Sequence, residues 1–235
     1  MNKILIPYLI VLLTHTCFGQ TISRDIYPES IRKEISLNWI VRDTTSGDLN
    51  KDGRTDIALV IQNNNKNHYK IENNGLGYDS INENERYLLI FFKTNTGYTL
   101  FNTIDSIIPE HDSPTISDPY SGIMISNGLL HVGYHYWANA GSWLMFNTEY
   151  IFQFLNEDFF LIGIEHDSMD RGTMEREKVS INFITRKMLI VNTIPEGENG
   201  EEEKSNSEWK TLELERLYKI SELSPTNIKV LDRFF

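Results

Sequence analysis

The residues from Gly47 to Val60 place oxygen-bearing side chains at alternate positions, an arrangement that suits a divalent cation. Calcium prefers six to eight oxygen ligands, and alternate side chains of a tightly curled loop can converge on one such ion. A glycine at the sixth position of this loop permits the sharp turn that convergence requires. The sequence therefore predicts a structural calcium site whose ligands are Asp48, Asn50, Asp52, the backbone carbonyl of Arg54, and Asp56, the last acting directly or through a water.

The residue at position 12 of this loop decides its type. An EF-hand has a bidentate glutamate there and continues into a helix. This chain instead has Leu59, inside the strand-like segment "DIALVIQ". A calcium loop that leads directly into a strand resembles the loops of FG-GAP and VCBS repeats, and the resemblance covers Trp39–Gln62. It implies the loop geometry and its metal, and not a seven-bladed propeller. The chain shows only one copy and lacks the Phe-Gly and Gly-Ala-Pro signatures of those repeats.

Aromatic and histidine side chains gather between residues 131 and 143. Four aromatics surround a predicted hairpin turn and are a candidate surface for a carbohydrate or protein ligand, although such residues also form cores. These candidates are Tyr134, Tyr136, Trp137 and Trp143. Two histidines, His131 and His135, have the spacing of a helical zinc pair. In the strand that their neighbours predict, they would lie about 13 Å apart, which argues against a shared zinc ion.

Two acidic segments are candidates for a hydrolytic site. Residues 108–122 contain Glu110, His111, Asp112 and Asp118, and residues 165–170 contain a glutamate, a histidine and two aspartates. Two carboxylates can cleave a glycosidic bond when they flank it, but short acidic loops are more often only solvated. The sequence contains neither a GxSxG nucleophile elbow nor a glycine-rich phosphate loop. A non-catalytic protein is therefore favoured over an enzyme.

The first 19 residues have the pattern of a secretory signal peptide. A short basic start precedes an apolar run, and small residues at positions 17 and 19 favour cleavage before Gln20. Lipid attachment at Cys17 is a less favoured alternative, because His15 and Thr16 stand where small apolar residues are expected. Since Cys17 is the only cysteine, the exported chain would have no disulfide. We expect a periplasmic or extracellular protein.

The net charge of the chain limits the classes of partner that it can bind. A net charge of −11 without a basic cluster disfavours nucleic acids and anionic membranes. Beyond the first 19 residues, no apolar run reaches the length of a membrane-spanning helix.

The elements that would position these residues are mainly strands. Runs of β-branched and aromatic residues alternate with turn signals, of which Asn127-Gly128 is the strongest. Strands are predicted over residues 56–62, 86–93, 97–104, 142–155 and 158–166, with hairpins over 122–137 and 179–194. Residues 28–35 predict a short helix, and residues 196–208 predict an acidic loop.

We expect residues 20–235 to form one all-β domain of mainly antiparallel hairpins, with at most one or two short helices. A sandwich, a barrel and a propeller-like sheet all remain open. The favoured function is an exported calcium-binding domain that serves as a non-catalytic binding, adhesion or envelope-associated module. The alternative is an extracytoplasmic hydrolase that uses carboxylates in residues 108–122 or 165–170.

Overall fold

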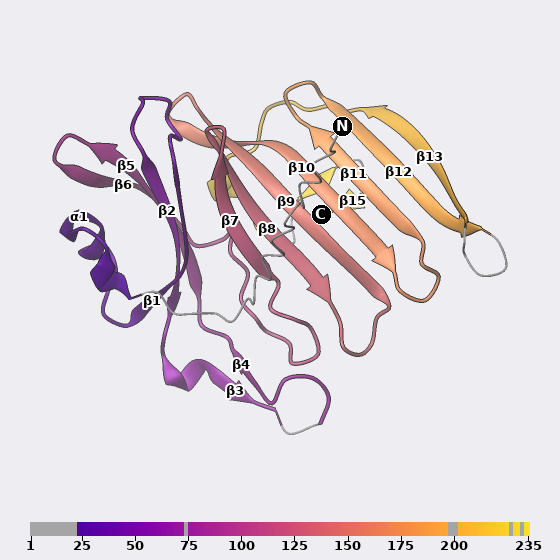
Figure 1. The fold of residues 1–235 in the computed structure, drawn as a ribbon, viewed down its shortest axis with the longest axis horizontal. Coiled ribbons are helices and arrows are strands. Elements are labelled where there is room, and N and C mark those ends of the chain that lie inside the picture. The colour runs from indigo at the N-terminus through magenta and orange to yellow at the C-terminus, as the bar shows by residue number, and fades with distance from the viewer. Residues whose placement is uncertain (1–22, 73–74, 197–201, 226–227, 231–232) are drawn as a thin grey trace, which may run out of the picture.

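The protein has the all-β fold that the sequence predicts (Figure 1). The computed structural model describes residues 23–72, 75–196, 202–225, 228–230 and 233–235. The predicted signal peptide over residues 1–19, including Cys17, lies outside the described residues. Two antiparallel sheets of four and seven strands make up most of the fold. Within the described part of the chain, no helix is long and apolar enough to cross a membrane.

The smaller sheet has the strand order β1-β2-β5-β6. Its strands are β1 (Trp39–Gly47), β2 (Asp56–Asn63), β5 (Arg86–Thr94) and β6 (Gly97–Ile104). Its central strands, β2 and β5, are buried on both faces. Ala58 and Val60 belong to the main core that the two sheets share, whereas Leu59 and Ile61 pack with residues Tyr27, Ile31 and Ile35 beside the short helix α1 (Glu29–Arg32). This double burial explains why β2 and β5 are continuous apolar runs rather than alternating ones.

The larger sheet is a meander in which spatial order follows chain order. Its strands are β7 (Tyr120–Ser126), β8 (Leu129–Trp137), β9 (Leu144–Leu155), β10 (Asp158–Asp170), β11 (Arg176–Asn182), β12 (Lys187–Glu196) and β13 (Glu202–Thr211). The predicted hairpin at Asn127-Gly128 is confirmed, because both residues have positive φ, of 52° and 74°, as a two-residue hairpin turn prefers. Alternate residues of these strands, such as Val132 and Phe152, face the main core.

Shorter elements close the ends of the structure. They are the 3₁₀ turns η1 (Arg24–Ile26), η2 (Lys66–His68) and η3 (Ile220–Glu222), and the small pairs of β3 (Tyr69–Ile71) with β4 (Ser80–Asn82) and of β14 (Lys229–Val230) with β15 (Arg233–Phe234). The segment after β13 contributes Leu212, Ile220 and Leu223 to the main core. The inner face of the larger sheet is therefore covered by both the smaller sheet and the C-terminal residues.

Side chains of β1 join the two sheets at the edge strand β7. One carboxylate oxygen of Asp43 accepts hydrogen bonds from the backbone N–H of Ile123 (3.1 Å) and the hydroxyl of Tyr120 (2.8 Å). Thr45 accepts a bond from the N–H of Ile125 at 2.9 Å. These side chains satisfy backbone donors of β7 that no strand pairs with, and they bring the end of β1 against β7. Residue 47 must be glycine there, because a Cβ would lie 2.4 Å from a methyl of Ile125.

Two segments that the sequence predicts as loops are strands. Residues 165–170 continue β10, where they pair with β9 and β11. Most of residues 196–208 form β13, which pairs with β12 from Thr211 to Glu202. Polar cross-strand contacts compensate for the missing apolar pattern in β13: Thr193 lies 2.9 Å from Ser205, and Lys204 pairs with Glu196 at 3.4 Å. An edge strand tolerates such polar composition because one of its sides remains in water.

Candidate functional site

The predicted calcium loop connects β1 to β2 and is curled by its own side chains. Asp48 accepts hydrogen bonds from the N–H groups of Asp52 (3.1 Å) and Gly53 (2.9 Å). Asn50 accepts a bond from the N–H of Asp52 at 3.0 Å, and Asp52 accepts one from Arg54 at 2.9 Å. Gly53 has a φ of +82°, which confirms the sharp turn expected at the sixth position. Such successive turns bring alternate side chains to one side of a loop.

Asp56 has a different environment from the other predicted ligands, because its side chain is completely buried. One carboxylate oxygen accepts hydrogen bonds from the backbone N–H groups of Leu49 (2.9 Å) and Asn50 (3.4 Å). The other accepts a hydrogen bond from the backbone N–H of Lys93 (2.9 Å). Burial raises the pKa of Asp56, and these backbone hydrogen bonds counteract part of that effect. The carboxylate thus connects the loop to the neighbouring strand β5. All three of these donors are backbone N–H groups, so none of these bonds is an ion pair.

The donor set has the chemistry of a calcium site, since every predicted ligand atom is an oxygen. In the described part of the chain, however, no three side chains of histidine, cysteine, aspartate or glutamate are grouped so that they could hold one metal ion. The predicted set includes three such carboxylates, and Asp56 is engaged by backbone donors. Both carboxylate oxygens of Asp48 accept backbone N–H bonds as well, so the loop is closed by its own hydrogen bonds. Calcium binding by Asp48, Asn50, Asp52, the Arg54 carbonyl and Asp56 stays a prediction.

The four candidate aromatics do not form one surface. Tyr134 is buried and donates a hydrogen bond to the carbonyl of Ile107 at 2.8 Å, and burial raises the pKa of its hydroxyl well above the usual value. Tyr136 is partly buried and stacks on Phe146. Trp137 and Trp143 are exposed, by 37% and 67% respectively. Only the two tryptophans therefore remain candidates for an outer binding surface.

Arg171 connects these tryptophans. Its guanidinium carbon lies 4.0 Å from the ring centre of Trp137 and 5.9 Å from that of Trp143. The same group donates hydrogen bonds to the carbonyl oxygens of Ala138 (2.8 Å), Ser142 (2.7 Å) and Trp143 (3.2 Å), which fixes the loop between β8 and β9. The sequence did not single out Arg171, because it lies about 30 residues away from the loop that it organises and nothing local indicates that contact.

The acids of residues 108–122 do not converge on a catalytic centre. Asp118 is held by both ends of the Arg86 guanidinium (2.6 and 2.7 Å) and by Arg42 (3.3 Å). Burial would raise the pKa of Asp118, but the hydrogen bonds and charges of these arginines bring it below the usual value. His111 is buried against the carbonyl of Ile116, whereas Glu110 and Asp112 are exposed. Asp118 is thus a structural ion-pair partner.

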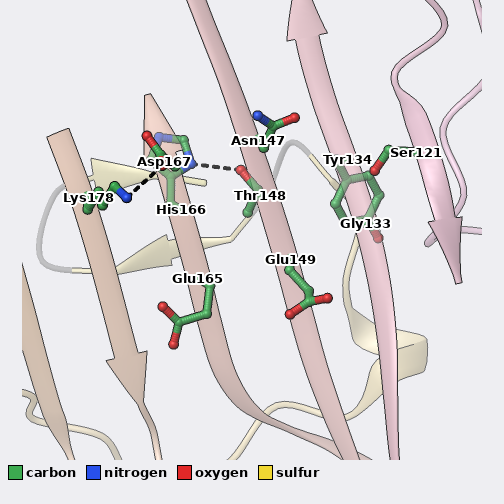
Figure 2. A pocket seen from close by; sticks show the side chains of 10 residues that line it. All are labelled: Ser121, Gly133, Tyr134, Asn147, Thr148, Glu149, Glu165, His166, Asp167 and Lys178. Carbon is green, nitrogen blue, oxygen red and sulfur yellow. Dashed lines mark hydrogen bonds and ion pairs between the residues drawn. The ribbon is translucent and has the colours of Figure 1, made fainter. Parts of the chain in front are cut away.

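Glu165 and Asp167 lie on the outer face of the larger sheet, in a shallow depression of about 400 Å³ (Figure 2), whereas Asp170 accepts hydrogen bonds from the N–H groups of Gly172 and Thr173 in the next turn. Glu165 is directly opposite Glu149 on the neighbouring strand, and Asp167 is paired with Lys178 at 3.2 Å. Glu165 also accepts a hydrogen bond from Ser180 at 2.7 Å. Like charges opposite one another cost stability, and His131 approaches Glu149 at 3.2 Å.

On the inner side of the same strands, Thr148 and His166 form a hydrogen bond of 2.7 Å (Figure 2). Burial lowers the pKa of His166. His166 is partly buried, with its ring near those of Phe146 and Phe235, although its sequence neighbours Glu165 and Asp167 are exposed.

Comparisons with protein-family models, with curated proteins and with solved structures found no match for this chain.

Proposed function

We propose that the protein is an exported β domain that calcium stabilises and that acts as a non-catalytic binding module. The observation that carries this proposal is the exposed indole of Trp143, beside a partly buried network of hydrogen bonds from Arg171 to the backbone of the same loop. Aromatic and arginine side chains on a rigid support are enriched at binding surfaces. The partner that we propose is a carbohydrate or a protein.

The position of the calcium loop supports a structural role for the ion. The loop begins directly after Gly47, where β1 meets β7, and a Cβ on Gly128 would lie 3.2 Å from the carbonyl oxygen of Asp48. The loop therefore packs against the turn between β7 and β8, at the junction of the two sheets. A calcium ion that orders this loop would hold both sheets together in a chain without disulfides, and an affinity on the order of 10⁻⁴–10⁻³ M would suffice outside the cell.

Removing calcium is expected to lower the melting temperature of the wild-type protein by about 2–12 °C. The reason is that a bound ion at this affinity adds about 1–3 kcal/mol, and each kcal/mol shifts a domain of this size by about 2–4 °C. The measurement is thermal unfolding followed by circular dichroism, with calcium and with a chelator. The variant Asp52→Ala should melt at the same temperature in both conditions.

The matched control for this experiment is Asp105→Ala, because Asp105 is an exposed carboxylate outside the loop. It should keep the full response of the wild type to the chelator. An equal response of wild type and Asp52→Ala would contradict the assignment of the ion to this loop.

Replacing Trp143 by alanine is expected to weaken binding roughly 30-fold, the effect of losing a hot spot worth about 2 kcal/mol. For a carbohydrate partner, co-sedimentation with peptidoglycan, chitin and cellulose measures this loss. For a protein partner, a photo-crosslinking amino acid at position 143 should give a discrete product in the producing cells. The matched control is position 209, because Trp209 is exposed to a similar extent, 65%, on the far strand β13. Equal results at both positions would count against this surface.

The hydrolase alternative has less support. Its best candidates, Glu149 and Glu165, lie on an open sheet face, and a hydrogen bond from Ser180 already engages Glu165. Catalytic carboxylates act best where the site excludes water. The acids of residues 108–122 are either exposed or, in the case of Asp118, bound by arginines.

A further inference from the structure

A second candidate site lies on the inner face of the larger sheet, under the loop of residues 109–119. A cavity of about 260 Å³ separates this loop from strands β8 and β9, and residues Pro225 and Phe235 close its far side. Sites for drug-sized ligands span roughly 300–1,000 Å³, so this cavity fits a smaller molecule. It is distinct from both the calcium loop and the surface around Trp143.

Aromatic rings make up much of the lining of this cavity, among them Tyr136, Phe146 and Phe235. Tyr136 and Phe146 are stacked, with ring centres 5.1 Å apart and planes 9° apart. Outside the lining, the ring of His166 lies 5.3 Å from that of Phe146 and 5.4 Å from that of Phe235. On the side of the loop, His111 packs edge-on against Tyr78 at 5.3 Å. Ring faces carry negative electrostatic potential, so such walls attract cations as well as apolar groups.

The charged side chains around the cavity have one sign. Glu110 and Asp112 are exposed at its rim, and none of the described residues that line it is a lysine or an arginine. Burial lowers the pKa of His135, although the charge of Asp118 opposes this. This shift favours the neutral form of His135, because the usual value is near 6.5. No lysine or arginine in this lining neutralises Glu110, whereas Lys70 lies within electrostatic reach of Asp112 from outside the lining.

We propose that this cavity binds a small organic cation, an ammonium group on an apolar body, with the apolar body against Tyr136 and Phe146 and the charge toward the rim at Glu110 and Asp112. A neutral apolar molecule would use the aromatic wall but not the carboxylates. An anion would meet two like charges and negative ring faces. The cation is the ligand class that uses both features of the cavity.

The experiment compares benzyltrimethylammonium with neopentylbenzene, its neutral analogue of the same shape, by calorimetry or by ligand-observed NMR at low salt. The cation should bind saturably, and the neutral analogue should bind about tenfold more weakly, since it lacks the attraction to the rings and to the rim. The double variant Glu110→Gln/Asp112→Asn changes only exposed side chains and should weaken cation binding about fivefold. Added salt should abolish that difference.

Tyr136→Leu removes a ring face at similar volume and should weaken cation binding about tenfold. Glu165→Gln is the matched control, because it removes an exposed carboxylate from the opposite face of the sheet. Equal affinity for the cation and its neutral analogue would overturn the proposal. So would cation binding that neither the rim variant nor Tyr136→Leu changes, or the lack of saturable binding up to about 10 mM.

Discussion

Replacing Asp118 by alanine is expected to lower the free energy of unfolding by about 4 kcal/mol, below the upper end for breaking a buried ion pair, because Arg86 is buried whereas Asp118 is 28% exposed. Arg86 is only 1% exposed and gives both of its terminal nitrogens to this carboxylate, while Arg42 approaches it at 3.3 Å. Without Asp118, two guanidinium groups would face each other with no anion. Arg86→Met should cost less, about 3 kcal/mol, because Arg42 still neutralises the remaining carboxylate. Urea unfolding at pH 7 measures both values.

The control for this prediction is Asp167→Ala, which removes the same side chain from an exposed pair with Lys178. Exposed pairs contribute about 1 kcal/mol or less. A loss from Asp118→Ala no greater than that from Asp167→Ala would contradict a structural role for the buried pair.

The pH dependence of this difference follows from the pKa of Asp118, which its arginine partners lower despite burial. A carboxylate with a lowered folded-state pKa contributes its full stability above the unfolded value of about 3.9 and loses it as the pH falls through the folded value. The stability difference between wild type and Asp118→Ala should therefore be largest at pH 7 and should shrink below about pH 4.

Local pattern was enough to predict most of the fold. Strong β propensity and turn signals placed β2, β5 and β6 within one residue of their observed bounds. The turn at Asn127-Gly128 needs only the positive φ that these two residue types tolerate. The strand β13 could not be predicted in the same way, because its stability comes from pairing with β12 rather than from its own composition.

Candidate sites were harder to predict than strands, because they depend on contacts between distant residues. The calcium loop is local, and its turn at Gly53 is as expected. By contrast, the sequence gives no signal that Tyr134 reaches the carbonyl of Ile107, or that Asp118 lies between two arginines. The cavity beneath residues 109–119 likewise combines strand, loop and C-terminal residues. The aromatic residues that line it do not recur at a regular spacing in the sequence.

Replacing Asp56 by alanine is expected to cost about 3–5 kcal/mol, even when calcium is absent. This side chain accepts hydrogen bonds from the N–H groups of Leu49, Asn50 and Lys93 in the interior. Each buried donor that loses its partner costs about 1–3 kcal/mol. Because Lys93 belongs to β5, the substitution would also free the loop from the smaller sheet. Urea unfolding in chelator measures this cost separately from any metal effect.

Comparing the stabilities of Asp56→Ala and Asp52→Ala distinguishes the effect of the Asp56 hydrogen bonds from the effect of calcium binding. Asp52 is exposed and accepts only one local backbone bond, from Arg54, in the described contacts. In chelator, Asp52→Ala should therefore be within about 0.5 kcal/mol of the wild type, whereas Asp56→Ala should already be strongly destabilised. In calcium, Asp52→Ala should lose the stabilisation by the ion as well. If Asp56→Ala in chelator were as stable as the wild type, the hydrogen bonds of Asp56 would not stabilise this loop.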